Sequence, residues 1–261
     1  MLSLSSVQLD AWIAFYCYPL ARVLGLIATA PVFNNKATPI RVRLLLGIAI
    51  TVALAPALPP MPAIAPGSGV GLAIMVQQTL IGIAMGFVMR LIFSAIDIAG
   101  DLIGLQMGLG FATFYDPQSA GQTAVVAEFF GLLATLMFLA LNGHLVMLAI
   151  LAQSFTQLPV SEILLMPGWH SLVRWAAALF SVGLLLAMPL IAALLITNIA
   201  LGVLTRAAPQ LNLFAVGFPV TLTVGFIMLL LSLPYLAPSF ERVFSQGLEA
   251  MTSVLPALAP K

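Results

Sequence analysis

The chain has 261 residues, of which 62% are hydrophobic and only 7% are charged, and its formal net charge is +1. A soluble domain carries about 25% charged residues, so this chain cannot cover a water-facing surface and is predicted to be an integral membrane protein. The near-neutral charge argues against a nucleic-acid-binding protein, which would show a concentrated basic patch. The single cysteine, Cys17, excludes an internal disulfide and a thiolate metal cluster.

Six apolar blocks are long enough to cross a bilayer, which takes roughly 20 residues in a helix. Because a lipid-crossing segment must satisfy its own backbone hydrogen bonds, we expect an all-α membrane protein in which these blocks are helical, some of them long or kinked. Pro189 is expected to kink the fifth block. The blocks cover residues 11–33, 44–64, 70–96, 124–152, 172–204 and 211–237.

The loops between the blocks differ in charge. Loop 34–43 carries three basic residues and loop 205–210 carries Arg206, whereas the proline-rich loop 55–69 carries no charge. Lysine and arginine are enriched on the cytoplasmic side of membrane proteins. We therefore predict that the two basic loops lie inside the cell and that the proline-rich loop lies outside.

The apolar run of the third block continues past residue 96 to about Gly110, and it carries polar residues on one side. Arg90, Ser94, Asp97 and Asp101 are spaced so that they follow a single stripe along a helix. Ionisable groups at membrane depth normally face a partner or a wet cavity. The stripe is either a proton path or a polar seam in which Arg90 pairs with Asp97 or with a neighbouring subunit, and we favour the seam because opposite charges can neutralise each other there.

Glycines in the same block recur every fourth residue, at Gly82 and Gly86 and again at Gly100, Gly104 and Gly108. Small residues at this spacing let two helices approach closely. We therefore expect the third block to pack tightly against other helices.

No residue pattern points to catalysis or to a cofactor. His144 and His170 have no cysteine, histidine or carboxylate at ligand spacing, so no metal site is expected. Nucleotide-binding and hydrolase motifs are absent. Arg22 and Glu128 lie inside apolar blocks and are expected to be salt-bridge partners at an interface, or capping residues, rather than catalysts.

The segment 106–123, QMGLGFATFYDPQSAGQT, interrupts the apolar sequence. Glycine permits unusual backbone angles, and the Asp116-Pro117 step favours a turn. The third helix should therefore end near Gly108–Gly110, and the next should begin near Thr123. Irregular backbone at membrane depth must be buried by protein or line a wet cavity. A plain cytoplasmic connection would explain the turn, but it explains less well why aromatic residues cluster there, namely Phe111, Phe114 and Tyr115.

The C-terminal segment 239–261 has an amphipathic pattern. Its apolar residues fall on one helical face and its charged residues on another. We expect a helix that lies on the membrane surface or against a partner, and we favour a partner because a basic polar face is absent. The apolar face consists of Phe240, Val243, Phe244, Leu248 and Met251.

Four long motifs occur in a characteristic order: PVFNNKATPIRVRLLLGIAI at 31–50, AIDIAGDLIGLQMGLGFATFYDPQSAGQT at 95–123, LNGHLVMLAILAQSFTQLP at 141–159 and LTRAAPQLNLFAVGFPVTLTVGF at 204–226. With these motifs the chain resembles the FliR family of flagellar biosynthesis proteins, the R subunit of the type III secretion export gate, called SctT in injectisomes. The resemblance covers nearly the whole chain.

The resemblance implies a non-enzymatic subunit of a protein export gate in the bacterial inner membrane, within the flagellar basal body. One R copy would assemble with P and Q subunits into a hetero-oligomeric channel, with the B subunit on the cytoplasmic side and unfolded flagellar subunits as substrates. The implied parts are a P-like helical part, 1–165, a Q-like helical hairpin, 166–238, and the amphipathic tail, 239–261.

The resemblance also assigns roles to residues. Loop 106–122 would act as a pore plug, and the tip of the Q-like hairpin would face the cytoplasm. The plug would use Gln106, Gly108, Gly110, Phe111, Phe114, Tyr115, Asp116, Pro117 and Gly121, and the tip would use Arg206, Pro209, Gln210 and Asn212.

Two other functions remain open. A proton-coupled secondary transporter would use Arg90, Asp97 and Asp101 as a relay. A purely structural scaffold would nucleate the assembly of the P and Q subunits.

Overall fold

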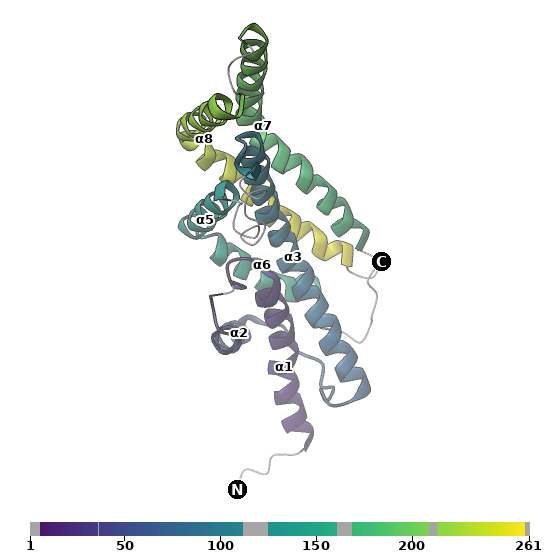
Figure 1. The fold of residues 1–261 in the computed structure, drawn as a ribbon. Helices are drawn as coiled ribbons and strands as arrows, with labels where there is room; N and C mark the ends of the chain where they lie inside the picture. The colour runs from purple at the N-terminus through teal and green to yellow at the C-terminus, as the bar shows by residue number, and fades with distance from the viewer. Residues whose placement is uncertain (1–5, 36, 112–124, 161–168, 209–212, 259–261) are drawn as a thin grey trace. The chain divides into compact units, whose positions relative to one another are not determined.

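The computed structural model describes residues 6–35, 37–111, 125–160, 169–208 and 213–258, and every regular element in these ranges is helical (Figure 1). This confirms the predicted all-α fold class. In chain order the elements are α1 (Ser6–Thr29), α2 (Ile40–Leu54), the 3-10 turn η1 (Ala55–Ala57), α3 (Gly69–Gln106), the 3-10 turn η2 (Leu109–Phe111), α5 (Val125–Ala140), α6 (Gly143–Gln157), α7 (Trp169–Ala207) and α8 (Leu213–Leu258).

Five of these helices, α1, α2, α3, α7 and α8, are long and apolar enough to cross a membrane, and the α5–α6 pair would make a sixth span. Three of them have 38, 39 and 46 residues. At 1.5 Å per residue these helices reach about 55–70 Å, roughly twice the apolar thickness of a bilayer. Helix α7 continues through Pro189.

The fourth apolar block differs from the prediction, because it forms two helices instead of one. The break falls at Leu141–Asn142, and Asn142 adopts a left-handed backbone conformation with φ 55°. Asparagine tolerates this conformation better than most residues, and the following Gly143 begins α6. The carbonyl of Asn142 then accepts the hydrogen bonds of the Leu145 and Val146 N–H groups, which starts the new helix.

The C-terminal segment also differs from the expectation. Helix α8 continues without a break through residues 239–258. Its apolar face was expected to lie on the membrane or on a partner, yet Phe240, Phe244 and Met251 are buried within the chain. An amphipathic pattern shows which face is buried but not what covers it, and here the chain itself does.

Backbone contacts divide the chain into two compact units, each built from separate stretches of sequence. Unit 1 contains Met1–Leu91, Asn142–Ala176 and Phe244–Lys261, and unit 2 contains Ile92–Leu141 and Ala177–Val243. Helices α3, α7 and α8 therefore contribute residues to both units.

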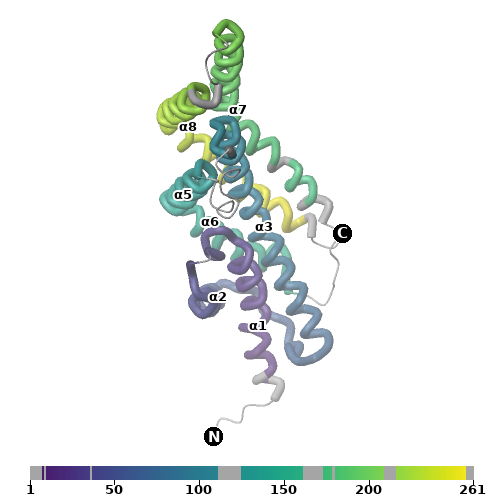
Figure 2. The backbone as a smooth tube through the Cα atoms, viewed as in Figure 1, coloured from purple at the N-terminus to yellow at the C-terminus, as the bar shows by residue number. Residues whose placement is uncertain are grey.

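In unit 1, glycines bring α1 into backbone contact with the first half of α3, and the tube in Figure 2 shows the two helices side by side. A Cβ atom on Gly82 would lie 2.0 Å from the Arg22 carbonyl oxygen, and one on Gly86 would lie 2.1 Å from Thr29 Oγ1. On the α1 side, a Cβ atom on Gly25 would lie 2.4 Å from the Thr79 carbonyl oxygen. The prediction of close packing is thus confirmed at Gly82 and Gly86.

Unit 2 has an aromatic core. The rings of Phe93 and Phe138 meet edge to face with centroids 5.7 Å apart, and those of Phe130 and Phe240 do so at 6.0 Å. Such edge-to-face pairs add to the stabilisation from apolar burial. These contacts join α3 to α5 and α5 to α8.

The glycines of the second half of α3 do not all serve packing. A Cβ atom on Gly100 would lie 2.4 Å from the Cα atom of Ala127 in α5, which confirms a close approach there. At Gly104 the nearest atoms would lie 3.9 Å away, an ordinary van der Waals distance. Among the described residues the close approach is therefore confirmed at Gly100 but not at Gly104, which lies opposite Val126, next to the first residue of α5, at ordinary contact distance.

Candidate functional site

The end of α3 forms the base of the predicted pore loop. The helix ends at Gln106, Gly108 adopts φ 83°, and the turn η2 follows. The N–H group of Gly108 donates to the Leu105 carbonyl oxygen at 3.0 Å. Glycine is the residue that adopts positive φ without a steric penalty, so it can terminate the helix here. The prediction that the helix ends near Gly108–Gly110 is confirmed.

Helix α8 holds this base in place within unit 2. The Thr221 hydroxyl lies within donating distance of two carbonyl oxygens, that of Met107 at 3.3 Å and that of Phe218 in its own helix at 3.0 Å, and Met107 is completely buried. Gly225, one turn further along α8, leaves the space that the Met107 side chain occupies, since a Cβ atom there would lie 2.6 Å from Met107 Cγ. A polar and an apolar contact thus fix the residue at which the loop begins.

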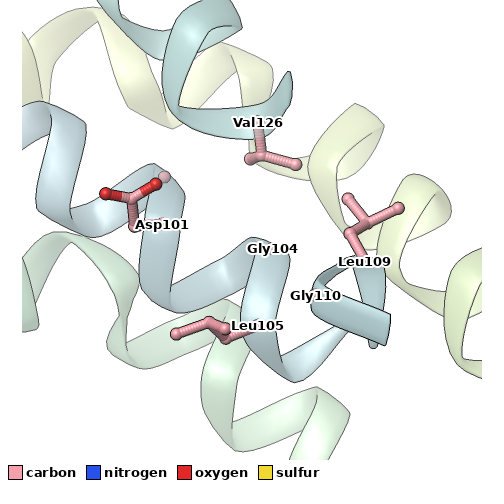
Figure 3. Close-up of a pocket in the computed structure, with 7 residues that line it drawn as sticks. Asp101, Gly104, Leu105, Leu109, Gly110 and Val126 are labelled. Carbon is pink, nitrogen blue, oxygen red and sulfur yellow. The ribbon is translucent and has the colours of Figure 1, made fainter. Parts of the chain in front are cut away.

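A small cavity of about 100 Å³ lies beside the base (Figure 3). Asp101 and Leu105 line it from successive turns of α3, Leu109 and Gly110 from η2, and Val126 from α5. Asp101 is the one ionisable group among the seven lining residues, which also include Gly100 and Gly104. The space suits a few water molecules, each of which occupies about 30 Å³ in the liquid.

The three charged residues of the polar stripe are all exposed. In the part of the chain that the structure describes, neither Arg90 nor Asp97 nor Asp101 forms a salt bridge within the chain. Helix α5 passes close to one of them, since a Cβ atom on Gly131 would lie 3.0 Å from Asp97 Oδ1. Their charges are therefore available to water or to another subunit.

Several predicted site residues cannot be placed. The plug residues Phe114, Tyr115, Asp116, Pro117 and Gly121, and the tip residues Pro209, Gln210 and Asn212, lie outside the described residues.

Three further site residues have a described backbone position. Gln106 is the last residue of α3, and Phe111 is the last residue of η2. Arg206 is exposed in the last turn of α7, where a positive charge interacts favourably with the helix dipole.

Among the described residues, no three histidine, cysteine or carboxylate side chains come close enough together to hold a metal ion. His144 lies in the first turn of α6. Glu128 is exposed in the first turn of α5, where a carboxylate interacts favourably with the helix dipole.

Arg22 is the residue whose surroundings the sequence analysis only partly anticipated. It was expected to be a salt-bridge partner at an interface or a capping residue, and it is completely buried and hydrogen-bonds to Gln78, Ser154 and the Leu158 carbonyl oxygen of the same chain. The salt-bridge alternative is wrong within the described residues, whereas the bond to Leu158, the C-cap residue of α6, agrees with the capping alternative. The adjacent glutamines Gln77 and Gln78, inside an otherwise apolar helix, were the signal that an internal polar partner was present.

Comparisons with known proteins identify the family of the chain. The profile of the family described as bacterial export proteins, family 1, matches residues 13–247. The flagellar biosynthetic protein FliR of Pectobacterium carotovorum subsp. carotovorum is 44% identical over 264 residues, covering 99% of this chain and 99% of that protein. FliR of Escherichia coli K12 is also 44% identical, with the same coverage of both chains. FliR of Bacillus subtilis is 31% identical over 69% of this chain and 71% of its own length. The chain therefore belongs to family 1 of the bacterial export proteins, together with the flagellar biosynthetic proteins FliR.

Proposed function

We propose that this chain is the R subunit of the flagellar type III export gate, which forms with P and Q subunits the channel for unfolded flagellar subunits. The observation that carries the proposal is the similarity, over 99% of both chains, to proteins named for flagellar biosynthesis. Membership of a bacterial export family, and five to six helical segments that are long and apolar enough to cross a membrane, support a place in the flagellar export apparatus of the inner membrane. The sequence carries no nucleotide-binding motif, so in this proposal the energy for export comes from elsewhere in the apparatus and no cofactor is expected.

One R copy would assemble with several P and Q subunits, with the B subunit on the cytoplasmic side. Residues 1–165 form the P-like part, 166–238 the Q-like hairpin with Arg206 near its cytoplasmic tip, and 239–261 the C-terminal tail. Large apolar side chains remain exposed along α7 and α8, including Leu185, Ile196 and Leu230. Neighbouring subunits would cover part of this surface, which supports a hetero-oligomer in the basal body.

The loop 106–122 acts as the pore plug in this proposal. Its base contacts α8 at two places. The Thr221 hydroxyl lies within hydrogen-bond distance of the Met107 carbonyl oxygen, and the Met107 side chain packs against Gly225. An anchored base would return the loop to the same position after each passing chain.

Deletion of residues 110–119 tests the plug. The complex should still assemble, but cells should become permeable to ions and small molecules, since nothing would fill the closed pore. Membrane conductance and uptake of a small dye would be measured. A variant with a glycine–serine segment of the same length serves as the control, because it keeps the volume of the backbone but removes the aromatic residues. Conductance equal to that of the wild type after the deletion would contradict the plug assignment.

The alternative, a proton-coupled transporter, makes a different prediction for Asp97→Asn. If the polar stripe is a contact between subunits, the exposed carboxylate of Asp97 pairs with a basic partner, and its loss lowers recovery of the complex. If the stripe is a proton relay, the complex forms normally and transport stops. Co-purification of the subunits and export of a flagellar substrate would be measured together, and Glu128→Gln provides a matched neutralisation of an exposed carboxylate.

A further inference from the structure

The side chain of Arg22 joins three helices of unit 1. Its Nε group donates to Gln78 Oε1 of α3 at 2.8 Å, and its Nη1 group donates to Ser154 Oγ of α6 at 2.9 Å. Its Nη2 group donates to the Leu158 carbonyl oxygen at the end of α6, at 2.8 Å. We call these residues, together with Phe155, the Arg22 cluster.

The partners of this buried cation are neutral. Arg22 is completely buried and, within the described ranges, forms no salt bridge with a carboxylate. A buried charge without a counter-charge costs several kcal/mol. Neutral groups of the Arg22 cluster must therefore supply the negative potential that a carboxylate would otherwise provide.

The end of α6 supplies that potential. Leu158 is the C-cap residue of α6, where unpaired carbonyl groups carry about half a negative elementary charge. The Phe155 ring, one turn earlier, lies with its centroid 4.1 Å from the Arg22 Cζ atom, so its negative face also attracts the guanidinium. Three of the four partners of Arg22 thus come from the last turns of α6.

Helices α1 and α3 alone leave Arg22 with one acceptor, Gln78. Their backbones are already in contact through Gly82, which lies against the Arg22 carbonyl oxygen. The acceptors that complete the hydrogen bonding of the guanidinium, Ser154 and Leu158, come from α6 and its C-cap.

We infer that burial of Arg22 and docking of the end of α6 are one coupled step, in which the C-terminal end of α6 acts as the counter-charge. Helix α1 packs stably on α3 only when residues 154–158 cover the guanidinium. The Arg22 cluster thus couples the packing of α1, α3 and α6, so that the three helices of unit 1 assemble cooperatively. This inference does not depend on the proposed export function.

The inference predicts that removing a hydrogen-bond acceptor of Arg22 destabilises the packing of α1 more than removing both the acceptor and the charge of Arg22. Gln78→Leu leaves the buried guanidinium with fewer hydrogen bonds, whereas the double variant Arg22→Met/Gln78→Leu removes the cation as well. Replacing both members of a buried polar pair with apolar groups is often nearly neutral. Adding Arg22→Met to the Gln78→Leu variant should therefore restore part of the lost packing of α1.

Cys17, the one cysteine in the sequence, provides the readout, because it lies half-buried on α1. The full-length chain in native membranes is treated with a bulky polyethylene glycol maleimide, which should label the half-buried Cys17 slowly in the folded chain and faster when α1 separates from its neighbours. We expect Gln78→Leu to raise the labelling rate roughly tenfold or more, since the lost hydrogen bond is made to a charged group. The double variant should label several-fold more slowly than Gln78→Leu alone.

Ser154→Ala has a matched control in Thr156→Ala. Both hydroxyl groups bond to a carbonyl three residues earlier in α6, but Ser154 is buried against Arg22 and Thr156 is exposed. Ser154→Ala should raise the labelling rate, and Thr156→Ala should leave it unchanged. Equal rates for these two variants would contradict the inference.

The amount of chain in the membrane is a second measurement, in case Gln78→Leu does not accumulate. The inference predicts that the double variant then accumulates to a higher level than Gln78→Leu. If the double variant is recovered in equal or lower amount, or labels as fast or faster, Arg22 contributes packing volume alone and the coupled step is wrong.

Discussion

Gly82→Ala should destabilise unit 1 by about 1–3 kcal/mol, the usual cost of forcing an extra group into a packed core. Alanine normally stabilises a helix by about 1 kcal/mol relative to glycine, so the expected effect has the opposite sign to helix propensity. The reason is that the new Cβ atom would lie 2.0 Å from the Arg22 carbonyl oxygen and 2.9 Å from the Leu26 backbone nitrogen. Both are backbone atoms of α1, which cannot move aside without separating the helices.

The measurement is the thermal unfolding midpoint of the detergent-solubilised chain, together with its amount in the membrane. Gly202→Ala is the control, because Gly202 also lies inside a helix, α7, and has nothing within 4 Å of its Cβ position. The control should unfold at the same temperature as the wild type or slightly above it. An unfolding midpoint of Gly82→Ala at or above that of Gly202→Ala would contradict the backbone contact between α1 and α3.

Gly100→Ala and Gly104→Ala should have opposite effects, although they lie one turn apart on α3. At Gly100 the Cβ atom would lie 2.4 Å from Ala127 Cα and 2.7 Å from the Ala127 nitrogen, so α5 would have to move. We expect destabilisation of unit 2 by about 1–3 kcal/mol. At Gly104 the nearest atoms lie 3.9 Å away, and alanine should be neutral or stabilise the helix by about 0.5–1 kcal/mol.

Each variant is the control for the other, because both replace a glycine of α3 with alanine. Thermal unfolding of the purified chain would be compared, and export would be measured by swimming motility. Gly104 also lines the small cavity beside Asp101, so the added methyl group has space to occupy. Equal destabilisation by both substitutions would contradict the wider spacing between Gly104 and Val126 of α5.

The break between α5 and α6 illustrates why one signal was underestimated. The dipeptide Asn142-Gly143 is a strong local turn signal, but it lies inside a block whose composition is otherwise that of a membrane span. Hydropathy averages over about 20 residues, whereas a left-handed residue changes the chain direction at a single position. The same kind of local signal, Gly108, was interpreted correctly at the end of α3 because several glycines and a proline surround it.

Arg22 illustrates a limit of a different kind. An arginine in an apolar helix indicates a polar partner, but the partner's position depends on how distant segments pack. Gln78 and Ser154 are 56 and 132 residues away along the chain. Periodicity places each of them on its own helix and does not relate one helix to another.

The sequence by itself determined the membrane class, the all-helical architecture, the export family and the end of α3, because composition, apolar length and glycine conformation act locally. Tertiary structure decided at which glycines two helices approach closely, what covers the C-terminal part of α8 and which groups surround Arg22. Those outcomes depend on the distance between helices, which differs even between Gly100 and Gly104 on one helix. A side chain's environment is set by the residues packed against it, and these come from distant parts of the chain.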